Sequence, residues 1–310
     1  MKAIMYHYVM PKDEKLPGLY RLDIKSFIKQ LDFFQENFGF ISKNEFFNSI
    51  KYTKKTSEGV VLTFDDGLKC HYDFVFKELK KRNLWGVFYV NTLPFQKNKI
   101  LDVHRIHILI SRINPKILYD YLMNNEIQKF FDKQKIKEFQ DLTYWNQIND
   151  KHTLLVKRIL NYFIEYNHRE IVLDELFNKF IENKITVDDY YLSIENLNEM
   201  NNEGMIVGNH TISHKVLSSL SKKSQKVEIE ESFNFIEQKI GVSTLKTFCY
   251  PYGGFHSFNK DTENILKKIN VDFSFNVEKR DVSNKDLLKR PHALPRYDCN
   301  QFKFGKNINN

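Results

Sequence analysis

Short segments rich in β-branched and aromatic residues alternate along the chain with segments in which apolar residues recur at helical spacing. Eight of the short segments are typical of strands: residues 3–9, 38–42, 60–64, 86–90, 205–209, 247–251, 271–275 and 292–297. Strands that alternate with amphipathic helices form parallel sheets. The pattern therefore predicts an α/β fold, a deformed or incomplete (β/α) barrel.

The predicted helices have recognisable ends. One helix lies between the first two strand segments, where apolar residues recur at helical spacing: Ile24, Phe27, Ile28, Leu31 and Phe34. Gly39 is expected to end it. Ser42 and Glu45 have the spacing of a capping box, which predicts the start of the next helix. A later apolar stripe, which Gly241 ends, consists of Ile229, Phe233, Ile236 and Ile240.

Residues 100–190 interrupt the alternation of strands and helices. They show helical spacing throughout, in sequences such as HTLLVKRILNYFIEY, and contain no convincing strand. We interpret them as an all-helical insertion within one catalytic domain of residues 1–300. A polar tail at 301–310 follows this domain.

Composition and charge fit an ordinary globular protein. The chain has 310 residues, 42% of them hydrophobic, and a formal net charge of +8. Lysine alternates with acidic residues along most helices, and no nucleic-acid-binding motif accompanies the basic surplus. We therefore expect no nucleic-acid partner, whereas peripheral contact with an anionic membrane stays open.

The cysteines and the hydropathy of the chain indicate a compartment. Cys70, Cys249 and Cys299 are odd in number and scattered, which is typical of free thiols in a reducing environment. The first residues lack the apolar core and cleavage site of an export signal. No apolar stretch reaches the roughly 18 residues that a membrane span needs. We expect a cytoplasmic protein.

Two adjacent carboxylates follow one strand segment. In VVLTFDDGLKC, residues 60–70, the apolar run ends at Asp65 and Asp66, and Gly67 permits a tight turn. Adjacent residues of an extended strand point to opposite sides, but a turn at the carboxyl end is able to bring both toward one cavity. Active sites of (β/α) barrels form at this end. An ordinary Asp-Gly turn is the alternative interpretation.

A pair of histidines follows another strand segment. His210 and His214, in GNHTISHK, are four residues apart, which places both imidazoles on one face of a helical turn. Two loop histidines without a ligand are the alternative. Together with one of the aspartates they make a three-ligand metal site with an open position for water, the pattern of a catalytic site.

These segments resemble the motifs of a known family. TFDDG, HTISH and FCYPYGG resemble, in this order, the first three motifs of the polysaccharide deacetylases, carbohydrate esterase family 4. The resemblance covers about residues 1–99 and 190–300 and excludes the helical insertion. It implies a deformed (β/α) barrel that binds a divalent metal ion and hydrolyses an acetyl group on a sugar. Zn²⁺ is the expected ion, with Co²⁺, Ni²⁺ or Fe²⁺ as alternatives.

The resemblance implies a role for each motif residue. Asp66, His210 and His214 correspond to metal ligands, and Asp65 to the base that takes a proton from the metal-bound water. The backbone N–H of Tyr252 corresponds to a group that binds the tetrahedral oxyanion. General chemistry agrees, because a metal ion lowers the pKa of its water toward about 7 and a neighbouring carboxylate then acts as base.

The sequence departs from the family pattern at one position. Many members place an arginine two residues before the proline of the third motif to orient the base, and here Cys249 occupies that position. Members that resemble the biofilm poly-N-acetylglucosamine deacetylases also lack this arginine. Arg296, in HALPRYDCN, is the candidate to replace it by pairing with Asp65. A surface arginine without this role is the alternative.

The first strand segment supplies the candidate proton donor. Ordinary members use a histidine in a late Leu-x-His motif, but His292 precedes the last strand segment here. Members that resemble the biofilm deacetylases are circularly permuted and carry the acid histidine near the N-terminus in a MYH strand. AIMYHYV resembles that strand, which implies that His7 is the general acid, with His292 in reserve.

Other histidines and aromatic residues carry weaker expectations. His104 and His107 share a helix face, and helix packing is the favoured interpretation over substrate contact. We expect His71 to be exposed on a helix, and His256 to lie near the third motif. Tyr72 and Tyr252 are candidates for stacking on a sugar ring, with packing as the alternative.

We therefore expect a metal-dependent hydrolase that removes an N-acyl group, in the first place acetyl, from a sugar in bacterial surface-glycan assembly. The expected partners are an N-acylated sugar, a nucleotide sugar or a lipid-linked glycan; the oligomeric state stays open. Two alternatives belong to other classes. A non-haem iron oxygenase also uses two histidines and a carboxylate, but on a double-stranded β-fold. An inactive glycan-binding module is disfavoured because Asp65 and His7 are both present.

Overall fold

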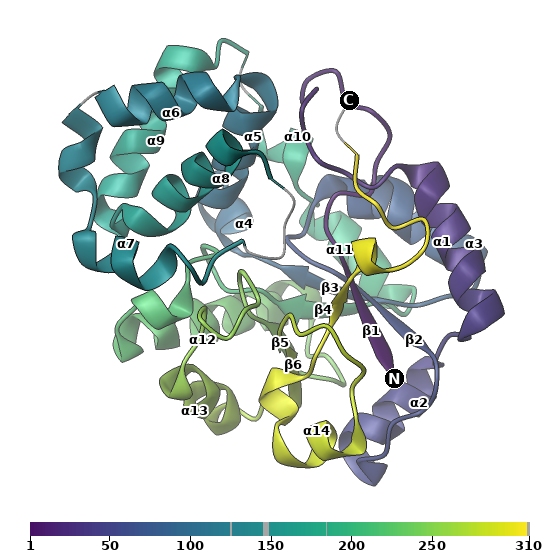
Figure 1. Cartoon of the computed structure of the whole chain (residues 1–310). Helices are drawn as coiled ribbons and strands as arrows, with labels where there is room; N and C mark the ends of the chain where they lie inside the picture. The colour runs from purple at the N-terminus through teal and green to yellow at the C-terminus, as the bar shows by residue number, and fades with distance from the viewer. Residues whose placement is uncertain (125, 145–148, 184, 309–310) are drawn as a thin grey trace. The chain divides into compact units, whose positions relative to one another are not determined.

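Seven strands form one fully parallel sheet in the computed structural model (Figure 1). Its order is β6-β5-β4-β3-β2-β1-β7. The bounds are β1 Lys2–Tyr6, β2 Val60–Phe64, β3 Val87–Val90, β4 Ile206–Asn209, β5 Thr247–Cys249, β6 Phe273–Phe275 and β7 Tyr297–Asp298. The sheet curls into a half-barrel surrounded by helices, which confirms the predicted deformed (β/α) barrel.

The structure describes residues 1–124, 126–144, 149–183 and 185–308, which fall into two compact units. Unit 1 comprises Met1–Pro11, Arg21–Lys99 and Thr186–Ile308 and holds the whole sheet. Unit 2 comprises Lys12–Tyr20 and Ile100–Ile185. It thus contains most of the segment predicted as a helical insertion, together with a short loop from near the N-terminus.

The last strand segment links the two edges of the curled sheet. Leu294 forms a parallel bridge with Phe275 of β6, while Tyr297 and Asp298 pair with β1. The predicted strand over 292–297 is therefore wrong in extent, since only its end joins β1. The predicted strand over 38–42 is also wrong and reduces to one bridge between Phe40 and Val60.

Local backbone geometry explains the missing second strand. Gly39 adopts φ +70° and its N–H bonds to the carbonyl of Phe34, so this segment closes a helix. Ser42 then starts the next helix in the predicted capping box with Glu45. Between these two constraints only Phe40 and Ile41 remain in extended form.

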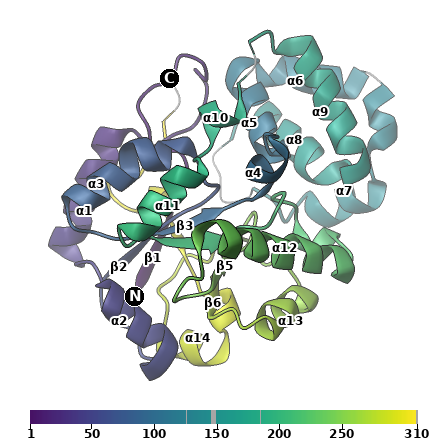
Figure 2. The same ribbon diagram turned by 180° about the vertical axis from the view of Figure 1, so that it is seen from behind.

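Nine helices of unit 1 flank the sheet. They are α1 Ile24–Asn37, α2 Lys43–Asn48, α3 Lys77–Lys81, α4 Leu93–Lys97, α10 Val187–Tyr190, α11 Ile194–Asn202, α12 Lys222–Ile240, α13 Lys260–Lys268 and α14 Asn284–Lys289. The predicted apolar stripes on α1 and α12 face the core, and Gly241 caps α12 as predicted. Figure 2 shows α11 and α12 side by side along β4.

The described part of unit 2 contains helices and no strand of two or more residues. They are α5 Asp102–Arg112, α6 Pro115–Asn124, α7 Lys133–Phe139, α8 Lys151–Arg158 and α9 Tyr166–Phe180. Within this unit α5 packs on α9 and α6 on α8 (Figure 1). Short π- and 3₁₀-helical segments complete both units: Ser49–Thr53, His71–Phe76, Glu126–Phe130, Ile159–Phe163, Leu217–Ser219, Pro291–Ala293 and Cys299–Gln301.

Both faces of the sheet are buried, so alternate residues of each strand enter different cores. Leu62 and Phe64 of β2 join the core beneath α1, α3 and α11. Val61 lies in the second core, inside the barrel, with Tyr89 and Phe273. This period of two decides which residues at the strand ends point into the barrel.

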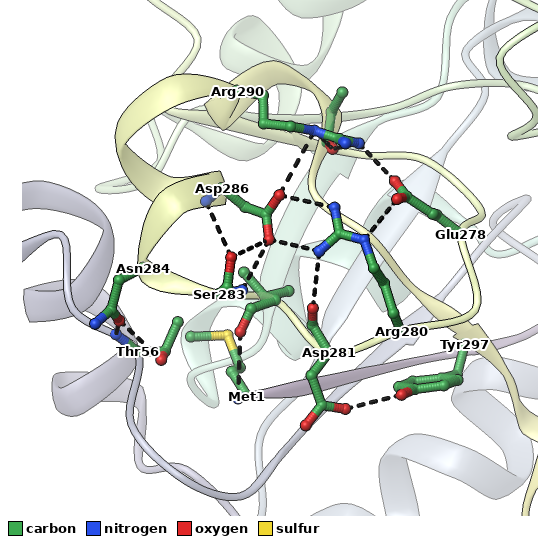
Figure 3. A network of polar contacts seen from close by, with 12 residues as sticks. Met1, Thr56, Glu278, Arg280, Asp281, Ser283, Asn284, Asp286, Arg290 and Tyr297 are labelled. Atoms are coloured by element: carbon green, nitrogen blue, oxygen red, sulfur yellow. Dashed lines mark hydrogen bonds and ion pairs between the residues drawn. The ribbon is translucent and has the colours of Figure 1, made fainter.

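A polar network fastens the crossover between β6 and β7 (Figure 3). Both carboxylate oxygens of Asp286 accept from the Arg280 guanidinium, at 2.7 and 2.8 Å. Arg290 binds Glu278 on the same crossover. The backbone N–H of Val282 donates to the carbonyl of Met1, so the network anchors the crossover at the amino end of β1.

The C-terminal segment pairs with the backbone of a segment near the N-terminus of unit 1. The backbone of Ile308 pairs with that of Arg21, so much of the predicted polar tail is docked; Asn309 and Asn310 lie outside the described residues. Of the helices that the structure describes, none combines the length and apolarity that crossing a bilayer requires.

We predict that Asp286→Asn lowers the free energy of unfolding by about 1 to 2 kcal/mol, because the buried carboxylate of Asp286 loses its charge-assisted hydrogen bonds with Arg280. Urea denaturation measures this. The matched control is Glu230→Gln, which breaks the solvent-exposed pair between Lys226 and Glu230 and should change the free energy by less than about 0.5 kcal/mol. Equal losses in both variants would contradict the anchoring role of the network.

Candidate active site

The interior rows of neighbouring strands end in polar residues. On β2 the row Val61, Thr63 continues to Asp65, directly after the strand. The β1–β2 register pairs Tyr6 with Phe64, so the next residue, His7, lies opposite Asp65. Adjacent strands are about 4.8 Å apart. The parallel register therefore brings these two predicted residues together at the carboxyl edge of the sheet.

The turn after β2 directs the second carboxylate to the same place. Asp66 adopts φ +83° and Gly67 φ +64°, so the strand alternation stops at Asp65. A left-handed conformation is disfavoured for aspartate and persists where the surroundings enforce it, as at functional sites. The N–H of Leu192 bonds to the Gly67 carbonyl at 2.9 Å and holds the turn. The predicted convergence of both aspartates is thus present.

The two histidines meet Asp66 from the end of β4. The Nε2 atoms of His210 and His214 each lie 3.4 Å from Oδ1 of Asp66. Their ring centroids are 4.8 Å apart, and all three side chains are buried. Thr211 and His214 have φ of +69° and +56°, so the HTISH segment is a loop with left-handed residues and not the helical turn expected.

Buried polar groups hold this loop in place. Glu228 of α12 accepts from the backbone N–H groups of Ile212 and Ser213, at 3.0 and 2.9 Å. The side chain of Asn209 accepts from the N–H of Thr211 at 2.6 Å. Glu228 therefore holds the loop that carries both histidines in place.

The donor set of Asp66, His210 and His214 fits a divalent metal ion. One carboxylate oxygen and two imidazole nitrogens lie within 4.8 Å of one another. The Nδ1 of His210 lies 2.7 Å from the carbonyl oxygen of Cys249, which fixes the tautomer and leaves Nε2 for an ion. Three protein ligands of this chemistry suit a catalytic Zn²⁺ with an open position.

A second possible donor set also contains His210, but its carboxylate already binds the guanidinium cation of Arg296. It consists of Asp65, His210 and Cys249. The Arg296 guanidinium binds both oxygens of Asp65, at 2.8 and 2.7 Å, and lies 2.9 Å from Cys249 Sγ. A metal dication on these atoms would face this positive charge. The electrostatics therefore favour the set with Asp66.

The pair of Asp65 and Arg296 is the ion pair at the centre of the barrel. Arg296 is fully buried, so it is no surface arginine, and it also donates to Thr63 Oγ1. Burial alone raises the pKa of Asp65, but Arg296 outweighs it, with help from His210 and His7, and lowers the pKa to about 2. Asp65 is therefore ionised at neutral pH. Burial raises the pKa of Cys249, which stays a thiol.

The third motif forms a turn beside the histidines. The N–H of Gly253 donates to the carbonyl of Tyr250 at 3.1 Å, and Tyr252 has φ +63°. The ring of Tyr252 lies 4.9 Å from that of His214. Gly253 has φ +68°, and a Cβ there would lie 2.3 Å from Val277 Cγ2, so only glycine fits. The oxyanion role of the Tyr252 N–H stays a prediction.

His71 corrects one expectation. It is not exposed but completely buried, between the rings of Phe64 and Phe88. Its Nε2 lies 2.7 Å from the carbonyl oxygen of His7. The π-helix His71–Phe76 turns this residue inward, whereas an α-helical pattern had placed it on the surface.

The other candidates lie apart from the metal-binding triad or serve packing. His292 lines a hollow with Lys54, Lys267 and Asp272, at the amino end of β6. Tyr72 stacks on Phe76 and donates to Glu199, which favours packing. His256 is half-buried next to Gly254. In unit 2, His104 is buried and its ring lies 5.9 Å from that of His107, as expected for helix packing.

Sequence reasoning missed three supporting residues: Asn91, Asn209 and Glu228. Asn91 follows β3, is buried, and donates to the carbonyl of His210. A polar residue at the end of a buried strand, or directly after it, is a usable signal for Asn209 and Asn91. Glu228 lies among the buried positions of α12, next to Ile229, and an acidic residue on an apolar face is the corresponding signal.

Comparison with known proteins agrees with this architecture. The polysaccharide deacetylase family model matches residues 152–274, which include the HTISH and CYPYGG segments but not TFDDG. No curated protein sequence matches the chain significantly.

Several solved structures share the fold. The Streptococcus pyogenes deacetylase PplD, solved in complex with acetate, is 16% identical with a TM-score of 0.56, covering 96% of this chain and 91% of its own. A de-N-acetylase from Aggregatibacter actinomycetemcomitans is 15% identical, with a TM-score of 0.54 and coverage of 96% and 93%. The BpsB deacetylase domain from Bordetella bronchiseptica is 14% identical, with a TM-score of 0.52 and coverage of 96% and 94%.

The family match contains the second and third motifs, and the alignments to the solved structures cover 96% of the chain. The three motifs lie at the carboxyl ends of β2, β4 and β5, where the barrel brings their side chains together. Residues 152–274 thus match the polysaccharide deacetylase family model, and the chain has the fold of several solved deacetylases.

Proposed function

We propose that this protein is a metal-dependent hydrolase that removes an acetyl group from an N-acetylated sugar. One observation carries the proposal: adjacent carboxylates have different partners. Asp66 faces the two imidazoles of His210 and His214, whereas Asp65 binds Arg296. Such a division supplies one metal ligand and one base within a single Asp-Asp pair.

Asp66, His210 and His214 would hold the ion, Zn²⁺ in the first place, with Co²⁺, Ni²⁺ or Fe²⁺ as alternatives. When bound, the ion supplies a Lewis acid that polarises the acyl carbonyl and acidifies water. Asp65 accepts the proton of the attacking water. The low pKa of Asp65 keeps it unprotonated at neutral pH, and Arg296 fixes both of its oxygens so that it points one way.

His7 donates a proton to the leaving amine, because an amine leaves a tetrahedral intermediate only after protonation. The β1–β2 register supports this role, because it puts His7 next to Asp65 at the carboxyl edge of the sheet. The N–H of Tyr252, on the turn that contacts His214, would bind the oxyanion.

The substrate is proposed from chemistry and charge. We place it among N-acetylated sugars of bacterial surface-glycan assembly, carried on a nucleotide or a lipid. The net charge of +8 favours a phosphate-bearing carrier. An assay of acetate release across N-acetylated nucleotide sugars and oligosaccharides, with the metal-loaded protein, tests the activity and orders these substrates.

The two alternatives fit the structure less well. Facial-triad oxygenases use a double-stranded β-fold, whereas this sheet is fully parallel. An inactive glycan-binding module would not need a buried, oriented Asp65 next to a metal-binding donor set.

We predict that His214→Ala loses the metal ion, since two remaining protein ligands bind far more weakly than three. Elemental analysis of the purified variant should show occupancy below about a tenth of the wild-type value. The matched control is His256→Ala, a half-buried histidine outside the triad, which should keep its metal. Wild-type occupancy in His214→Ala would disprove the ligand assignment.

We predict that Asp65→Asn keeps the metal ion and lowers deacetylation by about 10² or more, because the amide has the shape of the base without its basicity. Elemental analysis and steady-state kinetics on the same preparation measure both effects. Loss of the metal from Asp65→Asn, with retention in Asp66→Asn, would mean that the two carboxylates have the opposite roles.

We predict that Arg296→Met lowers the free energy of unfolding of chelator-treated protein by about 3 to 5 kcal/mol at pH 7. In the wild type the pKa of Asp65 lies near 2, below its ordinary value of 3.8, so the ionised pair stabilises the fold above about pH 4. This contribution disappears as the pH falls toward 2. The difference between wild type and variant should therefore narrow below pH 4.

Urea denaturation at pH 7, 5 and 3.5 measures the difference in the free energy of unfolding between the wild type and Arg296→Met. The double variant Arg296→Met/Asp65→Asn is the control, because it has no buried charge to leave unpaired and should recover part of the loss at pH 7. A difference that does not change with pH would contradict the ionic account.

A further inference from the structure

The carbonyl of His7 lies just beyond the β1–β2 ladder. The ladder ends where Tyr6 pairs with Phe64, and the Tyr6 carbonyl accepts from the N–H of Asp65 at 3.0 Å. Among the described residues no backbone N–H is recorded as donating to the carbonyl of the following residue, His7. A carbonyl removed from the strand ladder and partly buried still needs a donor, and the side chain of His71 supplies it at 2.7 Å.

His71 is built as a rigid donor. It has no exposed surface, and its ring packs edge-on against Phe64 and Phe88, with centroids 5.6 and 6.0 Å away. Among the described residues its Nδ1 has no hydrogen-bond partner, so Nε2 is the nitrogen that carries the proton. Burial lowers the pKa of His71 to about 4, which keeps the ring neutral at neutral pH.

The local backbone also favours a dedicated function. His71 opens a π-helix, the rare conformation that often marks functional sites. Tyr72, the second residue of this π-helix, donates a hydrogen bond to Glu199 on the outer side of the sheet. In this π-helix His71 therefore points into the protein interior and contacts His7, whereas Tyr72 lies at the outer edge of the core.

We propose that His71 is a positioning residue for His7: its hydrogen bond to the His7 carbonyl fixes the point from which the His7 imidazole delivers a proton to the leaving amine. This inference rests on the proposed function of His7. Its physical basis is that a misplacement of about 1 Å in a reacting group is able to cost about 10²-fold in rate.

The experiment compares two substrates, an N-acetylated oligosaccharide and an aryl acetate ester whose phenolate leaves without protonation. His71→Leu removes the donor and keeps an apolar side chain, whereas His71→Gln keeps an N–H at a similar distance from the backbone. Tyr72→Phe is the matched control, because it removes one hydrogen bond from the same π-helix. His7→Ala provides the reference for loss of the proton donor.

We expect His71→Leu to lower kcat for the amide by about 30-fold and for the ester by less than about 3-fold, with unchanged metal content. His71→Gln should recover most of the amide activity, and Tyr72→Phe should match the wild type. The double variant His7→Ala/His71→Leu should hydrolyse the amide no more slowly than His7→Ala, since both act through one proton transfer.

Equal losses on amide and ester in His71→Leu, or a further loss in the double variant, would overturn the positioning role. If His71→Leu does not fold, His71→Gln decides the question by its ratio of amide to ester activity, which should stay within about 3-fold of the wild type. Normal amide hydrolysis by His7→Ala is a different result: it would refute the proton-donor assignment itself, and this inference with it.

Discussion

A buried ion pair between Asp65 and Arg296 lies at the centre of the barrel. The proposed chemistry at the carboxyl edge of the sheet depends on this pair. Both charges are almost completely removed from water, which is costly unless each satisfies the other. The twin hydrogen bonds meet this requirement and fix the carboxylate in one orientation. They also disfavour a metal dication at Asp65, which is why we propose the neighbouring Asp66 as the metal ligand.

The parallel register extends this constraint to the rest of the site. Because β1 and β2 are in register, His7 lies opposite Asp65, and the interior row of β4 ends at His210. Residues beyond the ladders need other partners for their backbone groups. His71, Glu228 and Asn91 provide these partners, and each comes from a helix or strand end packed behind the site.

Much of the architecture could be predicted from the sequence, because hydrophobic periodicity reports burial directly. The helices ended by Gly39 and Gly241 follow from such patterns. The motifs identified the carboxylates and histidines as chemistry-bearing groups. The π-helix at His71 and the left-handed loop at His214 were not predictable, because tertiary contacts enforce backbone conformations that local propensity disfavours. The pairing of Arg296 with Asp65, 231 residues away, was predicted from the departure at Cys249 from the family pattern and not from local propensity.

The central claim is that two adjacent aspartates divide ligand and base between them. A crystal structure of the Zn²⁺-loaded protein, with the ion located by anomalous scattering, tests this claim most directly. The account predicts one ion about 2.0 to 2.2 Å from a carboxylate oxygen of Asp66 and from Nε2 of His210 and His214, with Asp65 still bound to Arg296. An ion bound instead by Asp65, His210 and Cys249, with Arg296 displaced, would contradict it.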